Sequence, residues 1–144
     1  MTTWIDDLAQ YLDDSTTGIG VFTPTSTETK SIYCNNLPST NVSLIILYPY
    51  EGTAPDFTHD GVNYRHPRLN VAVRSTAADG GHQKSIDIRT RLDHAHDLTL
   101  PSSVAARRYT LIESLGEPEY YGRDENGRGI FIQNFQVEYF NYTT

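Results

Sequence analysis

Acidic residues and histidines fall close together at two places in the chain, and such groups can hold a divalent metal ion. The first group is Asp93, His94, His96 and Asp97, which we place at the end of a helix. On a helix, the side chains of residues two positions apart point about 200° away from each other, so His94 and His96 cannot coordinate the same metal ion. We therefore expect a solvated helix end, where the helix dipole favours histidine.

The second group consists of His59, Asp60 and His66. These residues could bind a cation if the chain folded back on itself, but the stretch HDGVNYRH matches no ligand spacing typical of a metal site. Loop polarity is the interpretation we favour. A small metal-binding domain or enzyme that uses these three residues is the weaker alternative.

Motifs for covalent catalysis and for phosphate binding are missing from the sequence. No GxSxG elbow frames a serine, and no motif places Cys34, the single cysteine, beside a base. Neither GxGxxG nor GxxxxGK[ST] occurs. We therefore predict that the protein is not an enzyme and that it uses no cofactor and no metal.

A dense charged stretch, RDENGR, covers residues 123–128 near the C-terminus. A calcium loop of the EF-hand type needs ligands at alternating positions with a glycine after the third, whereas Gly127 follows Asn126 directly. Asparagine and glycine tolerate positive φ, and the side chain of Asp124 can bond to its own backbone. The stretch therefore predicts the tight turn of a hairpin, in which changing Asp124 to alanine would cost little stability.

Length and charge limit the class of protein. The 144 residues fit one domain, residues 1–144, and 18 acidic against 11 basic residues give a net charge of −7. That charge opposes nucleic-acid binding through phosphate neutralisation. There is no run of 18 apolar residues and no signal peptide pattern at the N-terminus, so we expect a soluble protein without membrane contact, made in the cytoplasm.

Hydrophobic periodicity predicts the elements of the first half. An apolar stripe predicts a helix over residues 4–12, with Thr2 or Thr3 as its N-cap. Brief strands are expected at residues 21–22 and 32–33, and the apolar run 42–48 predicts a central strand covered on both faces. Residues 49–67, with three prolines and two glycines, predict a long loop.

The second half predicts a strand, a helix and two more strands. Alternating apolar residues predict a strand over 69–74, and 3.6-residue spacing predicts a helix from Asp79 to about Asp97. Extended segments are expected at 104–112 and 130–140, the latter with Phe131, Phe135, Val137 and Tyr139 on one face. Together the pattern predicts an α+β fold, a mostly antiparallel sheet with an N-terminal helix and one longer helix packed on one face.

Tyrosine is abundant for a chain of this size, with 10 residues. Tyrosine is enriched at protein interfaces, where one end of the side chain is apolar and the other is wet. About half of these residues are expected in the core or in strands, and the excess favours a binding or assembly protein. The tyrosines considered are Tyr48, Tyr50, Tyr64, Tyr109, Tyr120, Tyr121, Tyr139 and Tyr142.

Four segments in order resemble one family of tailed phages: WIDDLAQYLDD, LIILYPYEGTAP, PRLNVAVRS before a helix, and GRDENGRGIFIQNFQVEYF. The family is the minor capsid proteins that act as tail terminators in long, non-contractile tails. The resemblance spans nearly the whole chain. Its most specific parts are the strand ending in Arg74 and the GxDENGR turn that leads into QNF at residues 133–135, whereas residues 25–40 match nothing in it.

The resemblance implies a structural virion protein at the tail–head junction. Such subunits form a ring, usually a homo-hexamer, on the head-proximal end of the tail tube, where they stop tube polymerisation and mediate head–tail joining. The implied partners are other copies of the chain, the tail tube protein and a head-completion or connector protein. DNA would pass through the lumen without specific binding, and acidic residues on the wall would repel its phosphates. A head-completion or neck protein of the connector is the alternative.

Two polar segments are the expected contact regions of such a ring, because a head-to-tail ring uses two different patches of each subunit. They are the expected loop 49–67 and the hairpin tip 124–128. The interface candidates are Tyr50, Glu51, Asp56, His59, Arg65, Arg123, Asp124 and Arg128.

Overall fold

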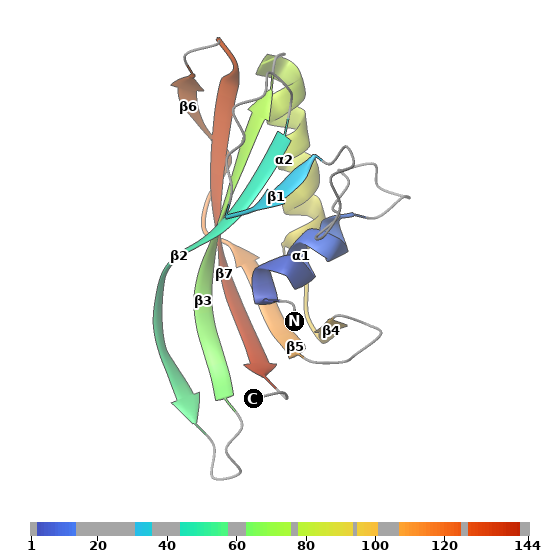
Figure 1. Ribbon diagram of the computed structural model, residues 1–144, viewed down its shortest axis with the longest axis vertical. Coiled ribbons are helices and arrows are strands. Elements are labelled where there is room, and N and C mark those ends of the chain that lie inside the picture. Colours follow the sequence, from blue (N-terminus) through green and yellow to red (C-terminus); the bar gives the residue numbers. More distant parts are fainter. Residues whose placement is uncertain are drawn as a thin grey trace.

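The computed structural model describes residues 3–13, 31–35, 44–57, 63–75, 78–93, 95–100, 107–124 and 127–141. Two helices pack against a curled sheet, and its long strands run most of the length of the molecule (Figure 1). The elements are α1 (Trp4–Leu12), β1 (Ile32–Cys34), β2 (Leu44–Phe57), β3 (Asn63–Ser75), α2 (Ala78–Leu92), β4 (Leu98–Leu100), β5 (Arg107–Ser114), β6 (Glu119–Arg123) and β7 (Gly129–Asn141).

The seven strands form one sheet in the order β1-β2-β3-β7-β5-β4, with β6 also paired to β7. Only the β1–β2 pair is parallel among these strands, and the other pairs are antiparallel. The prediction of an α+β fold with a mostly antiparallel sheet, an N-terminal helix and a longer helix on one face is confirmed.

Strands β5 and β6 share one edge of β7. β5 pairs with the C-terminal half of β7, from Ser114 opposite Phe135, and β6 pairs with its N-terminal end, from Glu119 opposite Ile132. The segment that links β5 to β6 has two more residues than the part of β7 that it faces. The chain therefore bends at this segment and then continues along the same edge of β7. The result is one bent hairpin arm, β5–β6–β7, whose tip lies at the turn after Arg123.

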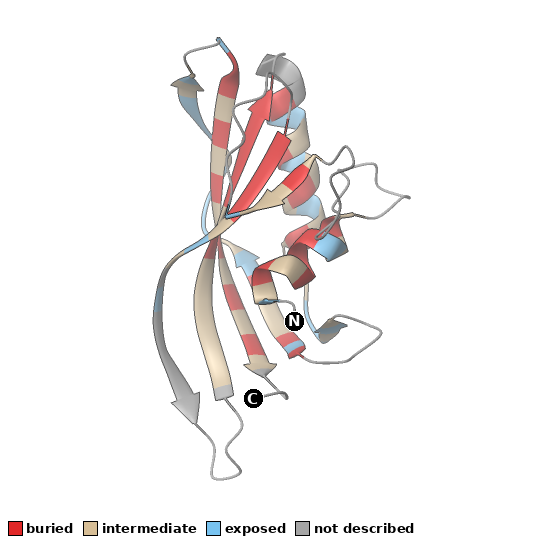
Figure 2. Ribbon diagram, in the orientation of Figure 1, coloured by how far each residue is buried: buried red, intermediate tan, exposed pale blue. Residues whose placement is uncertain are grey.

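The main core lies between the sheet and both helices (Figure 2). The predicted N-cap forms a capping box, since the Thr3 side chain accepts from the Asp6 backbone and Asp6 accepts from that of Thr3. The predicted inward face of β7 is confirmed, because its apolar members are all buried. The core residues include Ile5, Leu8, Leu12, Ile45, Leu47, Leu69, Val71, Val73, Ile88, Leu92, Ile112, Phe131, Phe135, Val137 and Tyr139.

A smaller apolar cluster lies on the opposite face of the sheet. Leu44, Ile46 and Ala72 are buried there, and Tyr33, Tyr48 and Ile132 pack against them. Strand β2 therefore buries consecutive residues on both of its faces, as its unbroken apolar run predicts.

The predicted loop 49–67 is wrong. β2 continues to Phe57 and β3 begins at Asn63, so most of this stretch forms two paired strands. Proline is tolerated because, beyond Leu47, the outer edge of β2 has no partner among the described strands. Ile45 N and Leu47 O face that edge, so Pro49 also faces it and forfeits no ladder hydrogen bond, whereas Pro55 lies within a register shift.

Close approach of β2 to β3 explains one glycine in this stretch. Pro67 lies opposite Gly52, next to a register shift. A Cβ at Gly52 would come within 3.0 Å of the His66 carbonyl oxygen and 3.1 Å of the Pro67 Cα. Gly52 and Pro67, which indicated a loop in the sequence, therefore lie where the backbones of β2 and β3 approach each other closely.

The predicted helix 79–97 starts close to its observed beginning but is too long. α2 spans Ala78–Leu92, and its predicted inward residues Ser85, Ile88 and Leu92 are buried. After Asp93 the chain turns, and Ala95 forms a bridge with Ile112 in place of continuing the helix. The apolar spacing of Ala95 fits a helix and a strand equally well.

The other strand predictions meet different outcomes. The short strand at 32–33 is confirmed as β1, and the segment 130–140 is confirmed as β7. The segment 104–112 corresponds to β5, although residues 101–106 lie outside the described residues, as does the strand expected at 21–22. β4 and β6 escaped prediction because β4 has three residues and the exposed sequence EYYGR of β6 does not alternate.

Candidate assembly surfaces

The tip of the β6–β7 hairpin is closed by a set of hydrogen bonds around Asp124. The backbone N–H of Arg128 donates to Asp124 Oδ1 at 2.9 Å, and Arg128 Nε donates to Oδ2 at 2.6 Å. The backbone N–H of Asp124 donates to the Arg128 carbonyl at 2.9 Å, and Gly127 adopts a φ of 76°. The predicted hairpin turn is confirmed, and its aspartate bonds to the backbone as expected.

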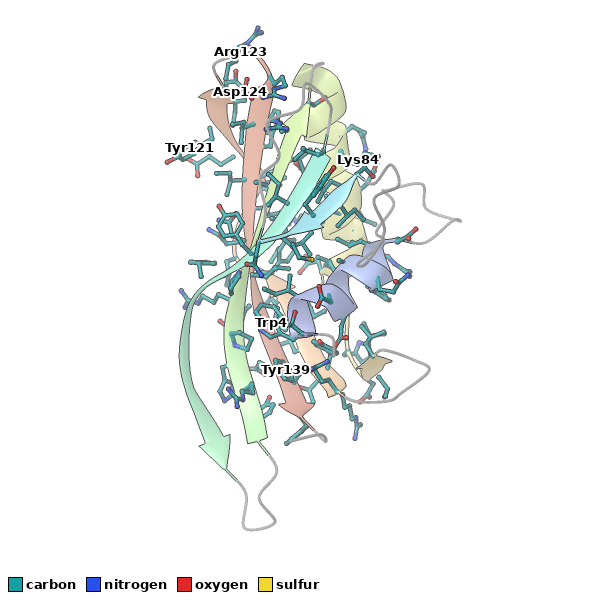
Figure 3. All side chains as sticks on the ribbon, viewed as in Figure 1. Trp4, Lys84, Tyr121, Arg123, Asp124 and Tyr139 are labelled. Carbon is teal, nitrogen blue, oxygen red and sulfur yellow. The ribbon has the colours of Figure 1, made fainter. Side chains whose placement is uncertain are left out.

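The three candidates at this tip have different surroundings. Arg123 is exposed and lies at the far end of the molecule (Figure 3), whereas Arg128 is buried and paired with Asp124. Arg74 is also buried at this end, and burial together with the nearby Arg128 lowers the pKa of its guanidinium while Asp124 opposes that change. Of the three candidates, Arg123 offers the most accessible side chain.

Two tyrosines on β6 form an exposed aromatic surface at the edge of the sheet. Tyr120 and Tyr121 are 49% and 72% exposed, and Tyr121 points away from the sheet (Figure 3). The pairing with β7 has a register shift between Tyr120 and Gly122, and Gly122 adopts a φ of 111°. The Tyr120 ring packs 5.2 Å from Phe131, so the surface is continuous with the core.

Four of the five candidates between residues 50 and 65 lie on strands, where the expectation was a loop. Tyr50 is half-buried on β2, opposite Arg68. Glu51 and Asp56 lie on the outer part of β2, with side chains outside the described set, and His59 lies wholly outside it. Arg65 lies on β3 directly opposite Tyr139.

Polar side chains pair with one another across β3 and β7 on the face away from the helices. The Tyr64 hydroxyl donates to Glu138 Oε2 at 2.8 Å, and His66 Nδ1 lies 3.5 Å from Glu138 Oε1. Further along the same face, Arg68 Nε donates to Gln136 at 3.2 Å and Asn70 Nδ2 donates to Asn134 at 2.8 Å. The rows of paired side chains run along the long axis of the sheet.

A buried polar network fixes α1 to β5. Asp7 Oδ2 accepts from Arg107 Nη1 at 2.9 Å and from the Tyr109 hydroxyl at 2.7 Å. The Tyr109 hydroxyl also lies 3.2 Å from the Trp4 carbonyl. Burial raises the pKa of the Asp7 carboxyl, and the bonds from Tyr109 and Arg107 oppose that rise.

The residues first considered for metal binding have other roles where they are described. Asp93 accepts from the Ser114 backbone and lies near Arg89, while Asp97 pairs with Arg108. His94 lies outside the described residues, and His96 is exposed. Within the described ranges, no group of three histidine, cysteine or acidic residues could hold a metal ion. Neither described helix is long and apolar enough to cross a membrane.

Comparison with protein families identifies this architecture. The profile of the family described as "Bacteriophage tail terminator protein" matches residues 11–141. The chain belongs to this family. The resemblance of its ordered segments is thereby confirmed, and the chain is a structural protein of the phage tail.

A solved structure shares the fold of this chain. A chain of the structure titled "Virion of native gene transfer agent (GTA) particle" superimposes with a TM-score of 0.67 at 14% identity. The similarity covers 96% of this chain and 95% of that one, so the two chains are alike in fold over nearly their whole lengths. No curated protein sequence matched the chain.

Proposed function

We propose that this tail terminator forms a ring, with six copies as the expected number, at the head-proximal end of a tail tube. The ring ends tube polymerisation and joins the tail to the head through a head-completion or connector protein. The match of the terminator family to residues 11–141 carries the proposal. The fold shared with a chain of a gene transfer agent virion supports it, because that chain also belongs to an assembled particle.

The shape of the subunit suits a closed ring. A head-to-tail ring needs two different contact patches on each copy. The molecule offers the outer part of β2 and β3 at one end and the β6–β7 hairpin with its exposed tyrosines at the other (Figure 1). We assign Tyr50, Glu51, Asp56, His59 and Arg65 to one patch. Arg123, Asp124 and Arg128 belong to the other.

Charge supports passage of DNA through such a ring without specific binding. The net charge of −7 leaves little basic surface to hold phosphates. In this proposal the chain has no catalytic role and takes no cofactor, and its place in the virion is the junction of tail and head.

A head-completion or neck protein is the second candidate, since it would lie in the same part of the particle. Deletion of the gene followed by negative-stain microscopy separates the two. Loss of a terminator should give overlong tubes and unattached heads, and the supplied protein should cap isolated tails. Tails of normal length in the deletion strain would contradict the terminator role.

A further inference from the structure

We propose that Arg65 is a docking point between neighbouring copies of this chain, where its guanidinium receives a carboxylate from the adjacent copy. This inference rests on the proposed ring and names one contact within it. It depends on where Arg65 lies, on what its side chain lacks among the described residues, and on the charges around it.

Arg65 lies at the end of the core face of the sheet. It stands opposite Tyr139 on β7, and Tyr139 is buried on the same face as Phe135 and Val137. The Tyr139 ring packs 5.3 Å from Tyr109 and 6.3 Å from Trp4. This aromatic group closes the core, and Arg65 lies beside it, half-buried.

The side chain of Arg65 has no ion pair and no hydrogen-bond acceptor in the part of the chain that the structure describes, and its Nε is fully shielded from solvent. Other described arginines contrast with it. Arg68 bonds to Gln136, Arg107 to Asp7, and Arg108 to Asp97. A guanidinium nitrogen withdrawn from water without an acceptor costs stability, so a carboxylate from outside the chain that satisfies this group would recover that cost.

The described charges that act on the Tyr139 hydroxyl are two guanidiniums and one carboxylate. Arg65 and Arg107 both act on the Tyr139 hydroxyl, where they oppose the rise that burial causes in its pKa. Asp7 is the nearby carboxylate, and it already accepts from Arg107 and Tyr109. Among the described residues this carboxylate is thus already paired, and the Arg65 guanidinium can pair with a carboxylate from another copy.

The occupant we commit to is an aspartate or glutamate of a second copy. A guanidinium matches a carboxylate with two parallel hydrogen bonds. The chain carries 18 acidic residues against 11 basic ones, so a neighbouring copy presents a surface rich in this group. Phosphate of nucleic acid is the poorer partner, because the same net charge of −7 repels it.

The test compares Arg65→Gln with Arg108→Gln in the full chain, which removes the same charge from an exposed arginine outside both proposed patches. Sedimentation velocity over a concentration series measures assembly, and urea unfolding of the dilute monomer measures stability. We expect Arg65→Gln to weaken assembly about tenfold or more, and Arg108→Gln to weaken it about twofold or less. The Arg65→Gln monomer should be as stable as the wild type or more stable, which a merely structural arginine would not allow.

A photo-crosslinking residue at position 65 identifies the occupant. In rings made from mixed light and heavy isotope copies, crosslinks should join light to heavy chains at a peptide containing aspartate or glutamate. Crosslinks confined within single copies would overturn the inference, as would normal assembly of Arg65→Gln. Wild-type protein that forms no ring, alone or on tail tubes, would instead overturn the proposed function.

Discussion

Asp124 holds Arg128 through two contacts at once, accepting from its backbone N–H at 2.9 Å and from its guanidinium Nε at 2.6 Å. One carboxylate thus closes the turn and neutralises a buried charge. A tight turn needs only the first of these bonds, so the second gives this residue a role in the core that turn chemistry alone does not imply.

Replacing Asp124 by alanine should therefore lower the free energy of unfolding by about 3 kcal/mol, because it leaves the buried guanidinium of Arg128 without its carboxylate. This replaces the small cost expected from the sequence. Thermal or urea unfolding measures the change. The exposed neighbour provides the control, since Arg123→Ala should stay within about 0.5 kcal/mol of the wild type. Equal stability of the two variants would show that the ion pair contributes nothing.

The contact between Gly52 and β3 gives a second prediction. Gly52→Ala should destabilise the protein by about 1 to 3 kcal/mol, because the new Cβ meets backbone atoms that cannot move aside. Gly116→Ala is the matched control, since a Cβ there meets nothing within 4 Å. Differential scanning calorimetry of both variants decides the point, and a normal melting temperature for Gly52→Ala would mean that β2 and β3 lie further apart than described.

The hydroxyl of Tyr109 is expected to stabilise the junction of α1 and β5. Tyr109→Phe should cost about 1 to 3 kcal/mol, because Asp7 Oδ2 loses a donor at 2.7 Å in a buried site. Tyr121→Phe removes the same atom from an exposed ring and should change the free energy of unfolding by less than about 0.5 kcal/mol. If both variants unfold alike, the Asp7 network does not hold the helix.

Asp7 also predicts a pH dependence of stability. Burial raises the pKa of this carboxyl above its ordinary value of 3.8 in the folded chain, so the folded state binds the proton more tightly than the unfolded state. Its contribution to stability is fully present below pH 3.8 and is lost as the pH rises through the folded-state pKa. The stability of the wild type relative to Asp7→Asn should therefore fall over that range in urea titrations.

Asp97 provides a control of opposite sign for the same titration. Its pairing with Arg108 lowers the pKa of the Asp97 carboxyl. Its contribution is present above 3.8 and is lost as the pH falls through the folded-state pKa. Relative to Asp97→Asn, the wild type should lose stability on acidification. The same direction in both variants would contradict the contrast between the two carboxyls.

Local chemistry made several parts of the fold predictable. The stripe of α1, the inward face of β7 and the turn at Asp124 each depend on neighbours in sequence, so periodicity and turn residues revealed them. Gly52 and Pro67 led to the wrong prediction of a loop, because their role does not depend on their neighbours in sequence. Their role depends on a partner strand that lies fifteen residues away along the chain, and an isolated sequence does not show whether an edge is open enough to accept proline.

The candidate surfaces depended even more on tertiary context. Arg65 and Arg128 are both arginines in polar stretches, yet one lacks a partner in the described chain and the other is buried against Asp124. Tyr120 and Tyr121 are exposed beside a register shift in the pairing of β6 with β7, and strand propensity does not predict where such a shift occurs. The family resemblance, by contrast, was readable from ordered segments because it needs no three-dimensional partner.

The shared edge of β7 has a mechanical consequence. β7 pairs with β3 along nearly its whole length and with β5 and β6 in succession on its other side, and it connects the hairpin tip to the opposite end of the subunit (Figure 1). A pull between these ends runs parallel to the strands, so it would load their hydrogen bonds in shear and together. Peeling one bond at a time would require a force across the sheet. The subunit is thus built to transmit tension along its long axis with little extension.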